Sequence, residues 1–178
     1  MEDWLEHGMI IFDLETNGLY DEVTTIHCLV IYDTEADQTL IYNDQGTQEP
    51  IVRGIQILAD ADCICGHNII NYDVPCIRKL YPWFEYNNII DTLLLSRLLH
   101  ADMMSVDKKR CWKQMPLQLY GRHSLESYGY RLGKYKGDFG KTCDWTEWSQ
   151  DMEDYCVQDV EVTKKLVKHF EKKLNATT

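Results

Sequence analysis

The chain has 178 residues, of which 44% are hydrophobic and 26% are charged, and these proportions suit a single folded domain with a sizeable core. They exclude a disordered tail protein, because such chains lack the apolar surface needed to fold. The formal net charge of −11 argues against a protein that coats nucleic acid through bulk charge, although a local basic surface is compatible with it.

Cysteine usage and the first residues predict where the protein works. The chain has seven cysteines, an odd number, and most of them lie in apolar or strand-like runs, which favours a reducing compartment. The first dozen residues contain three acids and no Lys or Arg, unlike a signal or transit peptide. No apolar run approaches the roughly 20 residues of a membrane helix. We therefore expect a cytoplasmic protein, in the host cell if it is viral, without a membrane partner.

The N-terminal part predicts an antiparallel meander of three strands: Met9–Leu14, Thr25–Tyr32 and Gln38–Tyr42. Helices and short strands then alternate, a pattern typical of parallel strands joined by crossover helices. The expected elements are a helix over Pro50–Ala59, a strand over Asp62–Gly66, a helix from about Val74 to Leu80, a strand over Asn88–Ile90 and a helix over Thr92–His100.

The rest of the chain predicts two helices separated by loops. Residues 101–122 lack periodicity and are expected to form a loop, and residues 133–144 form a second loop rich in Gly and Lys. A helix lies between them around Ser124–Leu132, and a long helix ends the chain. The sequence contains no internal repeats. We expect residues 1–178 to form one domain, with a leader over residues 1–7. The fold class is α/β: a mixed sheet in which an antiparallel meander is followed by parallel strands, with flanking helices.

The first candidate site is a pair of acids on the first predicted strand, Asp13 and Glu15. Residues i and i+2 of a strand point to the same face, so the two carboxylates stand side by side while Phe12 and Leu14 face the core. Such neighbours repel each other unless a cation lies between them, and a divalent metal is the usual one. Of three other Asp-x-Glu patterns, one is expected in a solvated turn at Asp33–Glu35, and two lie on the last helix, where i and i+2 do not share a face.

The second candidate is Asp73, which ends the run Gly66-His67-Asn68-Ile69-Ile70-Asn71-Tyr72-Asp73. This run follows a predicted buried strand and leads into a helix. Ligands of open α/β sheets bind at the carboxyl ends of strands, so the position favours a functional site. The alternative is that Asp73 only caps the helix that Pro75 helps to start.

The third candidate is Asp159, in the middle of the core-facing apolar stripe of the last helix. A carboxylate is unfavourable there unless it is paired, hydrogen-bonded or bound to a metal. Both a metal site and a buried Asp satisfied by a Ser, Arg or backbone partner remain open. Tyr155 lies one turn earlier on the same face. Four charged neighbours are expected on the outer faces of this helix: Glu153, Asp154, Glu161 and Lys164.

A basic segment at residues 108–141 holds nine of the 18 basic residues and only two acids. Aromatic residues interleave with these bases, as expected of a groove that tracks phosphates and stacks the bases of a single strand. The alternative is a solvated loop with tyrosines in the core. The candidates for strand binding are Lys108, Lys109, Arg110 and Arg122, and the interleaved aromatic residues are Trp112, Tyr120, Tyr128, Tyr130 and Tyr135.

Three ordered motifs give the chain a family resemblance: Asp13-x-Glu15, Asn68-x-x-x-Tyr72-Asp73 and Tyr155-x-x-x-Asp159. In this order they resemble the exonuclease motifs of the DEDDy proofreading 3′–5′ exonucleases, which have an RNase H-like fold. Segments 90–100, 123–133 and 157–160 are similar to the exonuclease domain of family A DNA polymerases from short-tailed phages. The resemblance spans about residues 8–172.

The resemblance implies a site that holds two divalent ions, Mg²⁺ or Mn²⁺, which agrees with four carboxylates and no His among the expected ligands. Asp13 would bridge both ions. Glu15 and Asp159 would complete the site for the attacking water, and Asp73 would hold the second ion largely through water. Tyr155 would orient the nucleophile.

The same resemblance implies substrate contacts near the acids. Thr16 and Leu19 would contact the terminal nucleotide, with Leu19 wedged between the last two bases. Asn68 and Tyr72 would line the pocket for the strand end. We therefore expect a metal-dependent 3′–5′ exonuclease that removes nucleoside 5′-monophosphates from single-stranded DNA, in phage replication proofreading or DNA degradation.

Other interpretations stay open. The four acids do not distinguish DNA from RNA, so a DEDDy exoribonuclease is one alternative, and a non-catalytic nucleic-acid-binding module associated with a polymerase is another. The resembled polymerases are much longer, whereas this chain ends 19 residues after Asp159. Either it is a separate exonuclease whose polymerase is encoded elsewhere, which Met1 and the leader favour, or it is an excised domain.

Overall fold

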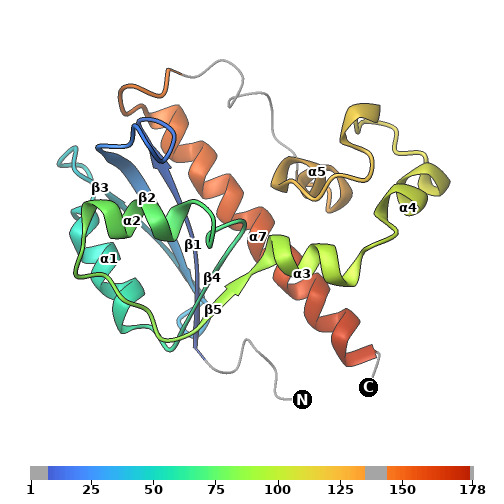
Figure 1. Cartoon of the computed structure of the whole chain (residues 1–178), viewed down its shortest axis with the longest axis horizontal. Helices are drawn as coiled ribbons and strands as arrows, with labels where there is room; N and C mark the ends of the chain where they lie inside the picture. Colours follow the sequence, from blue (N-terminus) through green and yellow to red (C-terminus); the bar gives the residue numbers. More distant parts are fainter. Residues whose placement is uncertain (1–7, 135–143, 177–178) are drawn as a thin grey trace.

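The computed structural model describes residues 8–134 and 144–176, which form a five-stranded mixed sheet flanked by helices (Figure 1). The strand order is β3-β2-β1-β4-β5. The strands β1 (Met9–Thr16), β2 (Ile26–Asp33) and β3 (Gln38–Asn43) pair antiparallel, whereas β4 (Cys63–Gly66) pairs parallel with β1 and β5 (Ile89–Asp91) pairs parallel with β4. The predicted α/β fold with a meander followed by parallel strands is confirmed.

The central strand β1 separates two cores, because its alternate side chains point to opposite faces. Phe12 and Leu14 are buried in the core beneath two helices, α1 (Ile51–Asp60) and α2 (Asp73–Leu80). Ile11 belongs to the core on the other face, where the long helix α7 (Gln150–Ala176) packs. The acids of β1 continue the row of Ile11, and they therefore face α7.

Helices α3 (Thr92–Leu99) and α5 (Leu125–Arg131) pack on α7 on the side away from the sheet (Figure 1). Residues 101–122 lie between these two helices, and the prediction that they form a loop is wrong. The segment contains the helix α4 (Met103–Arg110) and the 3₁₀ turn η2 (Leu117–Leu119). Helix α4 buries only its first residue and Asp107, so it has no apolar stripe that a search for periodicity could detect.

A buried ion pair fastens this segment to α5. The Asp107 carboxylate accepts hydrogen bonds from Arg131 Nε at 3.0 Å and Arg131 Nη2 at 2.6 Å. It also accepts one from Trp112 Nε1 at 2.9 Å and one from the backbone N–H of Gly121 at 2.8 Å. Burial by itself would raise the pKa of Asp107, but these hydrogen bonds outweigh burial and lower it. By binding the backbone of Gly121, Asp107 also helps to fix the position of the next residue, Arg122.

The start of α7 corrects another expectation. Glu153 is buried rather than on an outer face of the helix. Its Oε2 accepts a hydrogen bond from Asn43 Nδ2 at 2.6 Å and one from Trp148 Nε1 at 3.3 Å. These bonds satisfy the buried carboxylate and tie the first turn of α7 to the end of β3.

The remaining expectations concern membrane spans, the loop at residues 133–144 and the leader. Within the described residues, none of the helices has the length and apolar character needed to cross a membrane. Most of the loop expected over residues 133–144, and the whole expected leader at residues 1–7, lie outside the described residues.

Candidate active site

The acid pair of β1 lies against α7. Asp13 and Glu15 are half-buried on the face that α7 covers. The Cys156 thiol of α7 donates to the backbone oxygen and to Oδ2 of Asp13, both at 3.4 Å. One ligand atom from each of these three residues lies within 4.8 Å of the others. The predicted arrangement of two carboxylates on one face of the strand is therefore what β1 adopts.

Asp73 comes near Asp13 from α2, the helix on the opposite face of the sheet from α7. It is the first residue of α2, directly after the loop that follows β4, and it is buried. The residue at the N-cap position is Tyr72, which makes no side-chain capping bond, so Asp73 is not the cap of this helix. Burial raises the pKa of Asp73 to about 7.

Asp159 and Tyr155 come from the middle of α7. Asp159 is half-buried, and burial, followed by the charge of Asp73, raises its pKa to about 7. Burial, then the charges of Asp159, Glu15 and Asp13, raises the pKa of Tyr155. The phenol one turn before Asp159 thus stands within the field of the three carboxylates.

The four acids act on one another as a single cluster. Burial raises the pKa of Asp13 most, and the charges of Glu15, Asp159 and Asp73 raise it further. Burial and then Asp159 raise the pKa of Glu15. Three segments far apart in the sequence therefore bring like charges together, an arrangement that a bound cation would stabilise. The donors are carboxylate oxygens, which fit hard divalent ions such as Mg²⁺ and Mn²⁺.

A cavity of about 600 Å³ opens beside the acids. Asp13 and Asp159 line one part of it, and Arg97 of α3 and Arg122 line another. The remaining lining residues are His67, Asn68, Leu93, Gly121, His123, Ser124 and Leu125. A negative cluster and two guanidinium groups thus share one space, as a site for a phosphodiester would require.

The predicted substrate residues divide into those near the cavity and those away from it. Asn68 and Arg122 line the cavity. Lys108, Lys109 and Arg110 are exposed in the last turn of α4, which lies beyond α5 at the edge of the molecule (Figure 1). The structure therefore places Arg122 in the cavity lining beside the acids, whereas the other three basic residues are not among the lining residues.

Thr16 and Tyr72 join the first motif to the second, beside the loop that carries Leu19. The Tyr72 hydroxyl is hydrogen-bonded to the Thr16 hydroxyl and donates to the backbone oxygen of Gly18 at 2.6 Å. Burial raises the pKa of Tyr72 to about 12, so the phenol stays protonated and keeps this bond. Leu19 is 75% exposed at the tip of the loop between β1 and β2, where it is free to contact a ligand.

Asp91 is a positioning residue that the sequence interpretation missed. One of its oxygens accepts from the backbone N–H groups of Asn68 and Leu93, both at 2.9 Å, and the other accepts from Ile70 N at 3.1 Å. It therefore caps α3 and at the same time holds the loop before α2. Asn68 has φ of 65°, a left-handed conformation that Asn tolerates better than most residues. The signal that could have revealed Asp91 was an acid at the end of a strand and directly before a helix.

Among the aromatic residues of the basic segment, Tyr128 follows the alternative of a tyrosine in the core. This residue is buried in the core formed with Met103, Leu166 and Phe170, so its ring is not free to stack on a base. Its hydroxyl hydrogen-bonds His123 Nδ1 at 2.9 Å and so supports the cavity wall. Tyr135 lies outside the described residues.

Comparisons with known proteins agree with this geometry. The sequence pattern of the RNase H superfamily matches residues 10–171. The DNA-directed DNA polymerase of Escherichia phage T7 is 34% identical over 182 residues, an alignment that covers 89% of this chain and 26% of the polymerase. The chain thus spans about a quarter of the length of that relative.

Three solved structures, two of them of the same protein, share the fold at low sequence identity. Brucella melitensis NrnC bound to pGG has a TM-score of 0.63 and 16% identity, over 95% of this chain and 74% of that one. The complex of E. coli ExoI with single-stranded DNA has a TM-score of 0.58 and 17% identity, over 96% of this chain and 42% of that one. Another structure of NrnC, with bound Mg²⁺, has a TM-score of 0.62 and 16% identity, over 95% of this chain and 74% of that one.

The mixed sheet carries two carboxylates on its central strand, β1, and the chain belongs to the RNase H superfamily. Within it, the expected resemblance to the DNA polymerases of short-tailed phages is confirmed by the match to the phage T7 enzyme.

Proposed function

We propose that this protein is a metal-dependent 3′–5′ exonuclease that removes nucleoside 5′-monophosphates from single-stranded DNA. The observation that carries the proposal is the meeting of four carboxylates, from β1, α2 and α7, beside a cavity that also contains two arginines. Structural and binding roles do not require such a repulsive cluster, because it raises the free energy of the metal-free fold.

The acids would hold the metal and the phenol would hold the water. Asp13, Glu15, Asp73 and Asp159 would bind two divalent ions, Mg²⁺ or Mn²⁺. Ions bound in this way stabilise charge at a phosphoryl group and make water nucleophilic at neutral pH. Because the pKa of Tyr155 is raised, its hydroxyl keeps its proton and would donate a hydrogen bond that orients the reacting oxygen.

The cavity suits the end of a strand rather than a duplex. Its volume of about 600 Å³ lies within the range of roughly 300–1,000 Å³ that is usual for small-molecule pockets. Arg122 would contact a phosphate there, and Asn68 would line the pocket. Thr16 and Tyr72 support the loop that presents Leu19, which would separate the last two bases.

The match to the phage T7 enzyme supports a role in DNA replication or degradation. In this proposal the protein acts in the cytoplasm of a host cell, with DNA 3′ ends as substrate. A separately encoded DNA polymerase would be its partner in proofreading.

The test is incubation with 5′-labelled single strands in Mg²⁺, in Mn²⁺ or in EDTA. We expect a ladder that shortens from the 3′ end with either metal and no cleavage in EDTA. Asp13→Ala should keep less than about a tenth of kcat, a loss of more than roughly 1.4 kcal/mol in transition-state stabilisation. If no metal supports degradation, the protein is a binding module instead.

RNA is the second candidate substrate, because the four carboxylates would bind metal in the same way whichever sugar the strand contains. Matched DNA and RNA oligonucleotides in the same assay separate the two. Faster shortening of RNA would replace the proposed substrate and leave the chemistry unchanged.

A further inference from the structure

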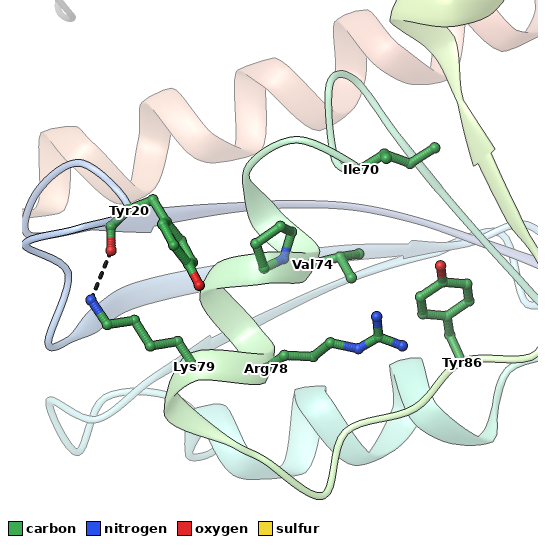
Figure 2. A pocket seen from close by; sticks show the side chains of 7 residues that line it. Tyr20, Ile70, Val74, Arg78, Lys79 and Tyr86 are labelled. Atoms are coloured by element: carbon green, nitrogen blue, oxygen red, sulfur yellow. Dashed lines mark hydrogen bonds between the residues drawn. The ribbon is translucent and has the colours of Figure 1, made fainter.

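A second cavity of about 470 Å³ lies on the outer face of α2, where that helix faces away from the sheet (Figure 2). Tyr20 stands at one end of it and Tyr86 at the other, with Val74 between them. We call this cavity the α2 groove. Its lining residues are Tyr20, Ile70, Val74, Pro75, Arg78, Lys79 and Tyr86.

The α2 groove adjoins the segments that carry the candidate catalytic residues. Tyr20 follows Leu19 in the loop after β1, and Ile70 lies two residues after Asn68 in the loop before α2. The Lys79 ammonium donates to the backbone oxygens of Tyr20 at 2.8 Å and of Asp21 at 3.0 Å, so it holds the loop after β1 against α2. A strand end bound near Leu19 and Asn68 would therefore have this groove beside it.

Two pairs of a cation and an aromatic ring line the α2 groove. The Arg78 guanidinium lies 5.1 Å from the centroid of the Tyr86 ring, and the Lys79 ammonium lies 5.3 Å from that of Tyr20. Tyr20 is 45% exposed and Ile70 is 40% exposed, so flat apolar surface is open to solvent. Stacking surfaces interleaved with phosphate-binding cations are the chemistry of single-strand binding.

Among the ion pairs of the described residues, one involves a cation of the groove, and it is exposed to solvent. Arg78 Nη2 pairs with Glu85 Oε2 at 2.7 Å, but the Glu85 side chain is 79% exposed. Exposed pairs of this kind contribute about 0–1 kcal/mol. A phosphate can therefore replace Glu85 as the partner of Arg78.

We propose that the α2 groove binds the nucleotides that precede the 3′ end of a single strand. The proposal rests on the function proposed above and adds a second part to the substrate site. Tyr20 and Tyr86 stack on bases, and Arg78 contacts a phosphate. The groove thus holds strands that reach beyond the catalytic cavity and does not contribute to dinucleotide binding.

Binding of uncleavable strands tests this proposal. The probes are phosphorothioate-linked single-stranded DNAs, one a dinucleotide and one of roughly ten nucleotides, a length within the usual site sizes of single-strand binders. Affinity is measured for the wild type, Arg78→Ala and Tyr86→Leu, which keeps an apolar side chain beside Phe84. Arg53→Ala, an exposed cation on α1, is the matched control.

We expect the wild type to bind the longer strand more tightly than the dinucleotide. Arg78→Ala and Tyr86→Leu should each weaken binding of the longer strand by at least about fivefold, while dinucleotide binding and the Arg53→Ala protein stay unchanged. Arg78→Ala should also reduce the salt slope by about 0.7. Unchanged affinity for the longer strand, an equal loss for both probes, or a wild type that gains nothing from length would overturn the proposal.

Cleavage of phosphodiester versions of both probes separates this proposal from the first. A wild type that binds with the expected length dependence but cleaves neither strand refutes the exonuclease and leaves the groove standing. A wild type that cleaves both strands, with groove variants that behave like Arg53→Ala, refutes the groove alone.

Discussion

Tyr155 owes its expected role to its place on α7, one turn before Asp159, where burial and carboxylates keep its hydroxyl protonated. Tyr155→Phe deletes that donor and leaves every carboxylate in place. The rate should fall by a factor within roughly 10²–10⁴, the range of positioned proton donors and acceptors, while Mn²⁺ affinity changes little. Single-turnover hydrolysis and a Mn²⁺ titration measure the two quantities. A rate equal to that of the wild type would make Tyr155 only a packing residue.

At the residue scale, the sequence predicted the acids better than the residues that position them. Asp13 and Glu15 could be predicted because the pair flanks Leu14, an apolar residue that continues the strand, and Asp159 because it interrupts an apolar stripe. Asp107 and Glu153 could not be identified as buried, because each is satisfied by hydrogen bonds from groups that only the fold brings together. Asp91 carried the signal of a helix cap, but its bond to the backbone of Asn68 also depends on the fold.

At the scale of elements, the strands and most helices follow their apolar periodicity, and α4 does not. Its buried residues are Met103 and Asp107, so its position depends on one carboxylate and the groups that bind it. A search for apolar periodicity therefore treats the segment as a loop. Helices held by polar contacts are the ones that periodicity does not predict.

Asp107→Ala tests this account of α4. The substitution leaves the buried Arg131 guanidinium without its partner, and breaking a buried pair in this way typically destabilises by about 3–5 kcal/mol. Urea unfolding followed by circular dichroism measures the loss. Asp102→Ala is the control on the same helix: Asp102 is exposed and makes no side-chain capping bond, so its loss should stay below about 1 kcal/mol. Equal effects of the two substitutions would contradict the role of Asp107.

The last turn of α4 carries another prediction. Neutralising Lys108, Lys109 and Arg110 together should weaken single-strand binding and lower the salt slope by about 0.7 for each phosphate that is no longer neutralised by the protein. Turnover of a bound strand end should change little, because none of the three lines the cavity. Binding isotherms at several salt concentrations give the slope. If affinity and slope stay as they were while Arg122→Ala reduces both, α4 lies outside the strand's path.

At the scale of the whole molecule, the acid cluster links stability to pH and metal. Carboxyl groups whose folded pKa is raised to about 7 hold protons that the unfolded chain releases above about pH 4. In the metal-free protein, the protons on these carboxyl groups therefore stabilise the fold at low pH. This contribution to the free energy of unfolding is lost as pH rises from about 4 to about 7. A bound metal needs the ionised acids, so its stabilising effect grows over the same range.

We therefore predict that Mg²⁺ raises Tm more at about pH 8 than at about pH 5. In metal-free protein, Asp159→Asn should raise Tm at about pH 8 and flatten its pH dependence, because it removes one repelling charge. Scanning calorimetry with Mg²⁺ or EDTA measures both. A Mg²⁺ effect that does not grow with pH would mean that the cluster does not bind the ion.

The chain offers its own control for the central claim, that the acid cluster is a hydrolytic metal centre. Two Asp-x-Glu pairs follow apolar runs, but Glu15 lies in the cluster, whereas Glu35 is exposed in a turn where Asp33 Oδ1 accepts from the backbone N–H groups of Glu35 and Ala36. The most direct measurement is therefore the Mg²⁺-dependent kcat/KM on a single-stranded DNA for Glu15→Gln and Glu35→Gln side by side. We predict a loss of more than about tenfold for Glu15→Gln and none for Glu35→Gln. A Glu15→Gln protein as active as the wild type would contradict the account.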